Sequence, residues 1–137
     1  MNYDFYDDVN VLSGYMAYDN SNKPDLFDPY EGYLKGNAFK NEYIPYKNYR
    51  VIKPNINNEK EEMLVNIGQY SFMAHDMNLY LDVFPNNREA LDRFIEYCNK
   101  TNELITKYER KYGPLAVKGD IGNTTPFNWV NNWPWVN

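Results

Sequence analysis

The chain has 137 residues, of which 43% are hydrophobic and 18% aromatic, and a formal net charge of −5, so it has room for one small domain. Its acidic balance and scattered basic residues argue against nucleic-acid binding. The apolar runs are too short for a membrane span, and Asp4, Asp7 and Asp8 occupy the place of a signal peptide, so we expect a protein made and kept in the cytosol.

Residues 1–57 form an N-terminal arm without helical or strand periodicity, and we expect it to be disordered or extended. Its first 25 residues mix Asp, Asn, Ser and Tyr, a composition typical of disorder. Between Leu26 and Pro54, proline and glycine interrupt an aromatic sequence and predict turns and extended pieces.

Nine of the fourteen tyrosines lie before residue 50. Rings in such a region suggest a surface that meets another molecule. The arm is then a docking peptide, or it wraps the helices of its own chain, and the sequence leaves both interpretations open. The candidate anchors are Phe27, Tyr30, Phe39, Tyr43 and Tyr46.

The first predicted helix covers residues 59–83. Asn58 can cap it, Glu61 completes the spacing of a capping box, and Pro85 ends the helix by about Val83. Its apolar residues recur in steps of three and four along one face. They are Met63, Ile67, Tyr70, Ala74, Met77, Leu81 and Phe84.

The second predicted helix covers residues 87–112. Asn86 followed by Glu89 repeats the capping signal, and Gly113 with Pro114 supplies the stop. Its inner face carries the same periodic spacing. The residues of that face are Leu91, Phe94, Cys98, Thr101, Ile105, Tyr108 and Tyr112.

The connection between the helices is only a few residues long, which forces them to be adjacent and antiparallel. The predicted fold is therefore mainly α, an antiparallel two-helix hairpin within a domain of residues 58–137, with an extended aromatic-rich arm and a Trp-rich tail. A turn near Asn87 pairs Met77 with Cys98 and Ala74 with Thr101 across the hairpin.

The apolar face of each helix is here called its stripe. The two stripes alone bury too little apolar surface to balance the entropy lost when about 50 residues are ordered. Further surface must come from the arm, the tail, a second copy or another protein. Phe72 and Leu79 lie seven residues apart on the face of the first helix opposite its stripe, and we expect them to mark a second contact face.

The tail from Pro114 to Asn137 holds all three tryptophans, Trp129, Trp133 and Trp135. A disordered tail is not usually so rich in tryptophan. The favoured interpretation is that these rings cap the hairpin, and the alternative is that they anchor an interface.

The sequence offers little for catalysis. His75 is the only histidine, and its neighbour Asp76 diverges from it by about 100° on a helix. No second His or Cys completes a transition-metal site, and Cys98, the only cysteine, falls on the inner stripe as a buried thiol. We therefore expect no enzyme, no cofactor and no metal site.

The segment FMAHDMNLYLDVFPNNREAL, followed by a helix bearing tyrosine, KYGPL, a glycine-containing loop and WVNNWPW, resembles the CotJB family of spore coat proteins. The match runs from Met63 to Trp135 in the same order. The segment GNAFKNEYIPYKNY resembles the short CotJA coat-associated proteins, although it lacks their fuller pattern. The resemblance implies a structural coat component, made in the mother-cell cytosol, deposited on the forespore surface and encoded beside a CotJC component that resembles manganese catalases.

The leading hypothesis is a non-enzymatic spore coat protein that contacts other coat proteins, including the CotJC-type partner, and can form a homo-oligomer. The main alternative is an accessory or regulatory subunit of that catalase-like partner. The predicted interaction residues are Phe72, Leu79, Trp129, Trp133, Trp135, Tyr30, Phe39 and Tyr46.

Overall fold

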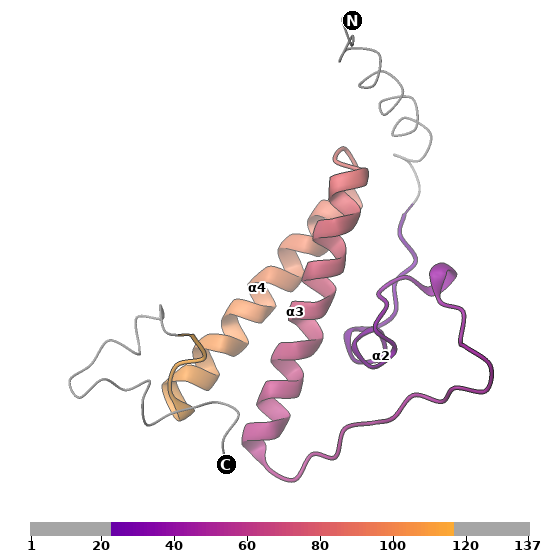
Figure 1. The fold of residues 1–137 in the computed structure, drawn as a ribbon. Coiled ribbons are helices and arrows are strands. Elements are labelled where there is room, and N and C mark those ends of the chain that lie inside the picture. The colour runs from indigo at the N-terminus through magenta and orange to yellow at the C-terminus, as the bar shows by residue number, and fades with distance from the viewer. Residues whose placement is uncertain (1–22, 117–137) are drawn as a thin grey trace, which may run out of the picture.

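A computed structural model describes residues 23–116, and its principal feature is the predicted antiparallel hairpin. Helix α3 (Glu59–Val83) and helix α4 (Arg88–Tyr112) lie side by side along their length (Figure 1). The arm contributes a short helix, α2 (Pro29–Lys35), and a 3₁₀ turn, η1 (Lys40–Glu42). No strand occurs between residues 23 and 116. The mainly helical fold class is confirmed.

Local capping sets the ends of α3 as expected. The Asn58 side chain accepts the Glu61 N–H at 2.9 Å, and the Glu61 carboxylate accepts the Asn57 N–H at 2.8 Å. This is a capping box whose return bond falls one residue early. Phe84, which precedes Pro85, closes the last turn through its N–H to the Tyr80 carbonyl at 2.9 Å.

The predicted cap of the second helix was off by one residue. Asn87, not Asn86, caps α4, because its side chain accepts the Ala90 N–H at 3.0 Å. Asn87 is also buried, whereas Asn86 is exposed at the turn. The helix consequently begins at Arg88 rather than at residue 87.

Both predicted stripes avoid solvent, since each of their residues is buried or half-buried. The best buried residues of α3 are Met73, Ala74 and Met77, and those of α4 are Ala90, Tyr97 and Tyr108. At the open end of the hairpin, Lys111 forms an ion pair with Glu59. That pair lowers the pKa of Glu59 and raises the pKa of Lys111, chiefly through the hydrogen bond between the two side chains.

The arm differs from the expected turns and extended pieces because it contains α2. Asp28 caps this helix by accepting the Glu31 N–H at 3.1 Å, and Pro29 occupies its first position. Gly36 ends it at φ 66°, a left-handed conformation that favours glycine. An isolated antiparallel bridge between Leu26 and Phe39 closes the segment on itself.

Candidate protein-interaction surface

The arm packs on a second face of α3, the one turned away from α4. Figure 1 shows α2 on the opposite side of α3 from α4. Two glycines allow the close approach. A Cβ on Gly32 of α2 would lie 2.9 Å from the Met73 sulfur, and a Cβ on Gly68 of α3 would lie 2.9 Å from the Tyr33 hydroxyl. A larger residue at position 32 would have to displace the fully buried Met73, and one at position 68 would have to displace the ring of Tyr33.

A hydrogen bond joins the arm backbone to α3. The N–H of Ala38, which is fully buried, donates to the Asp76 carboxylate at 3.0 Å. A buried N–H without an acceptor is costly, so Asp76 holds the arm at a defined register on the helix. The carboxylate considered as a partner of His75 is therefore a docking group for the arm.

Aromatic rings line the contact between the arm and the loop end of α3. Phe39 stacks on Tyr80 with ring centroids 5.3 Å apart, and the Tyr80 and Phe84 centroids are 4.7 Å apart. Within the arm, Phe27 and Tyr43 meet edge to face at 6.0 Å. Such pairs contribute about 0.5–1.5 kcal/mol beyond the area that they bury.

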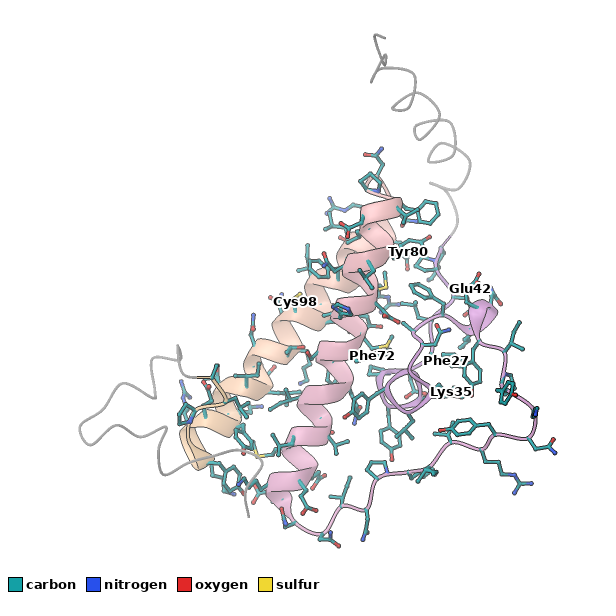
Figure 2. All side chains as sticks on the ribbon, in the orientation of Figure 1. Phe27, Lys35, Glu42, Phe72, Tyr80 and Cys98 are labelled. Atoms are coloured by element: carbon teal, nitrogen blue, oxygen red, sulfur yellow. The ribbon has the colours of Figure 1, made fainter. Side chains whose placement is uncertain are left out.

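A groove of about 540 Å³ opens beside these rings. Figure 2 shows Tyr80 on α3 and Glu42 on η1, and both residues line the groove. Phe39, Tyr80 and Phe84 supply aromatic walls. The remaining lining residues are Lys23, Pro24, Asp25, Asn41 and Glu42.

Residues 44–58, here called the linker, connect the arm to α3 and lie open to solvent. Ile44, Tyr46 and Ile52 are 87%, 74% and 81% exposed. At its tip, the Tyr49 N–H donates to the Tyr46 carbonyl at 3.0 Å and closes a turn. Exposed apolar side chains gathered in one segment are typical of an interaction surface.

The predicted interaction residues fall into different environments. Phe72 is half-buried and meets Tyr33 edge to face at 6.4 Å, whereas Leu79 is 51% exposed. Tyr30 and Phe39 are half-buried within the arm, and Tyr46 is largely exposed. Trp129, Trp133 and Trp135 lie outside the described residues.

The two interpretations of the arm therefore apply to different parts of it. Phe27, Phe39 and Tyr43 pack within the arm or on α3, so this part wraps its own chain. Tyr46 belongs to the exposed linker. The arm accordingly supplies some of the apolar surface that the hairpin alone lacks.

The residues considered for chemistry do not assemble a site in the described part of the chain. His75 is exposed on α3, and the free thiol Cys98, expected to be buried, is only half-buried at the edge of the core. Between residues 23 and 116 no group of three His, Cys, Asp or Glu side chains could hold a metal ion. The helices in that range are also too short or too polar to cross a membrane.

Periodicity alone missed three residues that organise the packing. Met73 is fully buried and Tyr80 half-buried because the arm covers the side of α3 that the stripe left free. Tyr97 is buried beside Tyr70, with ring centroids 6.4 Å apart, although the stripe placed Cys98 at that level. The run of apolar residues around Met73 was the available signal that α3 is covered on two sides.

The chain was compared with known protein families, curated proteins and solved structures. A family model described as CotJB protein matches residues 61–136, more than half of the chain. The matched segment contains almost all of α3 and the whole of α4, whereas α2, η1 and the linker precede it. No curated protein and no solved structure matches the chain.

Proposed function

Because the chain belongs to the CotJB family, a family of spore coat proteins, we propose that it is a structural component of the endospore coat that acts through protein–protein contacts. The main structural support for this role is the exposed linker. Ile44, Tyr46 and Ile52 are large apolar side chains exposed within one segment of the chain, where another molecule can contact them. The hairpin and the docked arm then form the scaffold that presents them.

The proposed partners are other coat proteins, and among them a CotJC-type protein that resembles manganese catalases. The family resemblance supports this choice. In this arrangement the partner would carry the metal chemistry and this chain would hold it in the coat. The alternative role is that of an accessory or regulatory subunit, which would change the partner's activity rather than its position.

Affinity purification from sporulating cells tests the structural role. We expect the tagged chain to recover the catalase-like partner and other coat proteins. A linker variant, Tyr46→Ser with Ile52→Ser, should recover less of them, while Asn55→Ser at another exposed linker position should behave as wild type. Equal recovery by both variants would contradict the role of the linker.

Peroxide consumption separates the two roles. A structural role predicts that the purified partner consumes peroxide at the same rate with and without this chain. A changed rate at saturating chain would favour the regulatory subunit. A fluorescent fusion should also lie at the forespore periphery late in sporulation, and a uniform cytosolic signal at that stage would contradict a coat location.

Deletion of residues 126–137 tests the proposed contacts of Trp129, Trp133 and Trp135. Failed co-purification with an unchanged melting temperature would assign the tryptophans to an interface. Unfolding of the deleted chain would assign them to its own fold. A deletion that changes neither would contradict both interpretations.

A further inference from the structure

Two unlike surfaces of this chain carry opposite charge. One is the exposed turn Tyr46–Tyr49 at the linker tip, and the other is the groove between η1 and the loop end of α3. Because one surface projects and the other is concave, the turn of one copy of the chain could occupy the groove of another.

The turn presents two aromatic side chains together with positive charge. Tyr46 and Tyr49 are 74% and 56% exposed. Lys47, at a left-handed φ of 50°, places its ammonium 5.0 Å from the Tyr46 ring centroid. Residues 43–58 contain no Asp or Glu, so Lys47, Arg50 and Lys53 give this stretch a charge of +3. The rest of a chain of net charge −5 then carries −8.

The groove offers what such a turn would bind. Its volume of about 540 Å³ is in the range of pockets that enclose a small ligand or an aromatic side chain. Phe39, Tyr80 and Phe84 pack on one another and give the groove an aromatic lining that a further ring can contact. Glu42 lies at the rim and is exposed, and within residues 23–116 no cation lies at ion-pair distance from it.

The other charges at the groove are already paired. Lys23 lies 3.2 Å from Glu89, and Asp25 lies 3.7 Å from Lys40. Glu42 is therefore the carboxylate that an incoming Lys47 or Arg50 would meet. The first 22 residues carry four Asp and no Lys or Arg, so their charge does not complement Glu42.

In one copy the linker does not fill its own groove. It leaves η1 and runs toward the first turn of α3, at the opposite end of that helix from Tyr80 and Phe84 (Figure 1). We propose that the Tyr46–Tyr49 turn of one copy inserts into the groove of a second copy, with Lys47 or Arg50 facing Glu42. This contact rests on the proposed structural role, and it specifies which surfaces of two copies would meet.

The contact joins two different surfaces, so it is heterologous. A pair of copies joined in this way keeps one free groove and one free turn, and a heterologous contact that does not close into a ring continues as an open chain of subunits. Such growth would give an extended assembly of subunits rather than a closed dimer.

Two variants of the full-length chain separate the surfaces. The turn variant carries Tyr46→Ser and Tyr49→Ser, and the groove variant carries Asn41→Trp and Glu42→Lys. All four positions are exposed, so circular dichroism and melting temperature should match wild type. Asn55→Ser in the linker and Asn78→Ser on α3 are the matched controls.

Sedimentation velocity gives the readout. The average mass of the wild type and of both controls should rise with concentration, and each variant should associate at least about tenfold more weakly, as expected for loss of an aromatic anchor. An equimolar mixture of the two variants should form a dimer and stop there, because it contains one intact turn and one intact groove per pair.

Three results would overturn the inference. They are a wild type that stays monomeric up to about 1 mM, a turn variant that associates as well as wild type, and a mixture of variants that remains monomeric. A monomeric wild type that still recovers coat proteins would reject this contact and leave the proposed coat role standing.

Discussion

Replacing Asp76 with Ala should release the arm from α3. The Asp76 carboxylate accepts the N–H of Ala38, which is fully buried, at 3.0 Å. Truncation leaves that N–H without its acceptor at a cost of about 1–3 kcal/mol. Alanine recovers up to about 0.7 kcal/mol through its higher helix propensity. The net destabilisation is therefore on the order of 1–2 kcal/mol, and for a domain of this size it should lower the melting temperature by roughly 5–15 °C.

Two controls isolate the hydrogen bond. Asp76→Asn keeps an oxygen in the same place and should retain most of the stability. Asp82→Ala removes an exposed carboxylate from the same helix, so it reports the gain in helix propensity without loss of a buried bond. Hydrogen exchange followed by mass spectrometry should show faster exchange in residues 26–43 of Asp76→Ala, while α4 stays protected.

Two results would refute this reasoning. One is an Asp76→Ala protein that has the same melting temperature as Asp82→Ala and whose arm remains protected from hydrogen exchange. The other is an Asp76→Asn protein as unstable as Asp76→Ala, because the loss would then follow the charge rather than the acceptor.

Three further predictions follow from single contacts. Asn87→Ala should lower the unfolding free energy by about 1–2 kcal/mol in urea titrations, because the cap of α4 is lost. Asn86→Ala should be nearly neutral. A larger loss for Asn86→Ala than for Asn87→Ala would show that Asn86 is the cap, as expected from the sequence. Gly32→Ala should destabilise the protein despite the better helix propensity of alanine, because the added Cβ would meet Met73, which is fully buried and cannot move freely. An unchanged melting temperature would contradict the close approach of α2 to α3. Burial raises the pKa of Tyr97 above its usual value of 10.0, so the tyrosine ionises more readily in the unfolded chain than in the folded one. Its contribution to stability is therefore complete below pH 10.0 and is lost as the pH rises through the folded pKa. Urea titrations from pH 8 to pH 11.5 should show a shallower alkaline loss of stability for Tyr97→Phe than for wild type, and identical slopes would refute this.

The ends of the long helices were predictable because they depend on residues close together in the chain. Asn58 and Glu61 satisfy the first N–H groups of α3, and Pro85 prevents its continuation. The error at α4 was one residue, since Asn86 and Asn87 carry the same side chain and only the turn geometry decides which of them faces the Ala90 N–H. The hairpin itself followed from the short connection between two periodic segments.

Helix α2 was equally local, yet it was missed. Asp28, Pro29 and Gly36 are a cap, a first residue and a left-handed stop in the correct order. In a seven-residue segment the same residues also fit a series of turns, because so short a helix depends on tertiary packing for most of its stability. The contact between Gly32 and Met73 supplies that packing.

The sequence by itself determined the helical hairpin and the resemblance to a coat family, since both rest on patterns that are continuous along the chain. Only the tertiary structure decided that the arm covers the second face of α3 and that the linker stays exposed. The bond from Ala38 to Asp76 joins residues 38 positions apart. Neither residue carries a local signal for the other, because such a contact depends on which surfaces remain unburied after the helices have packed.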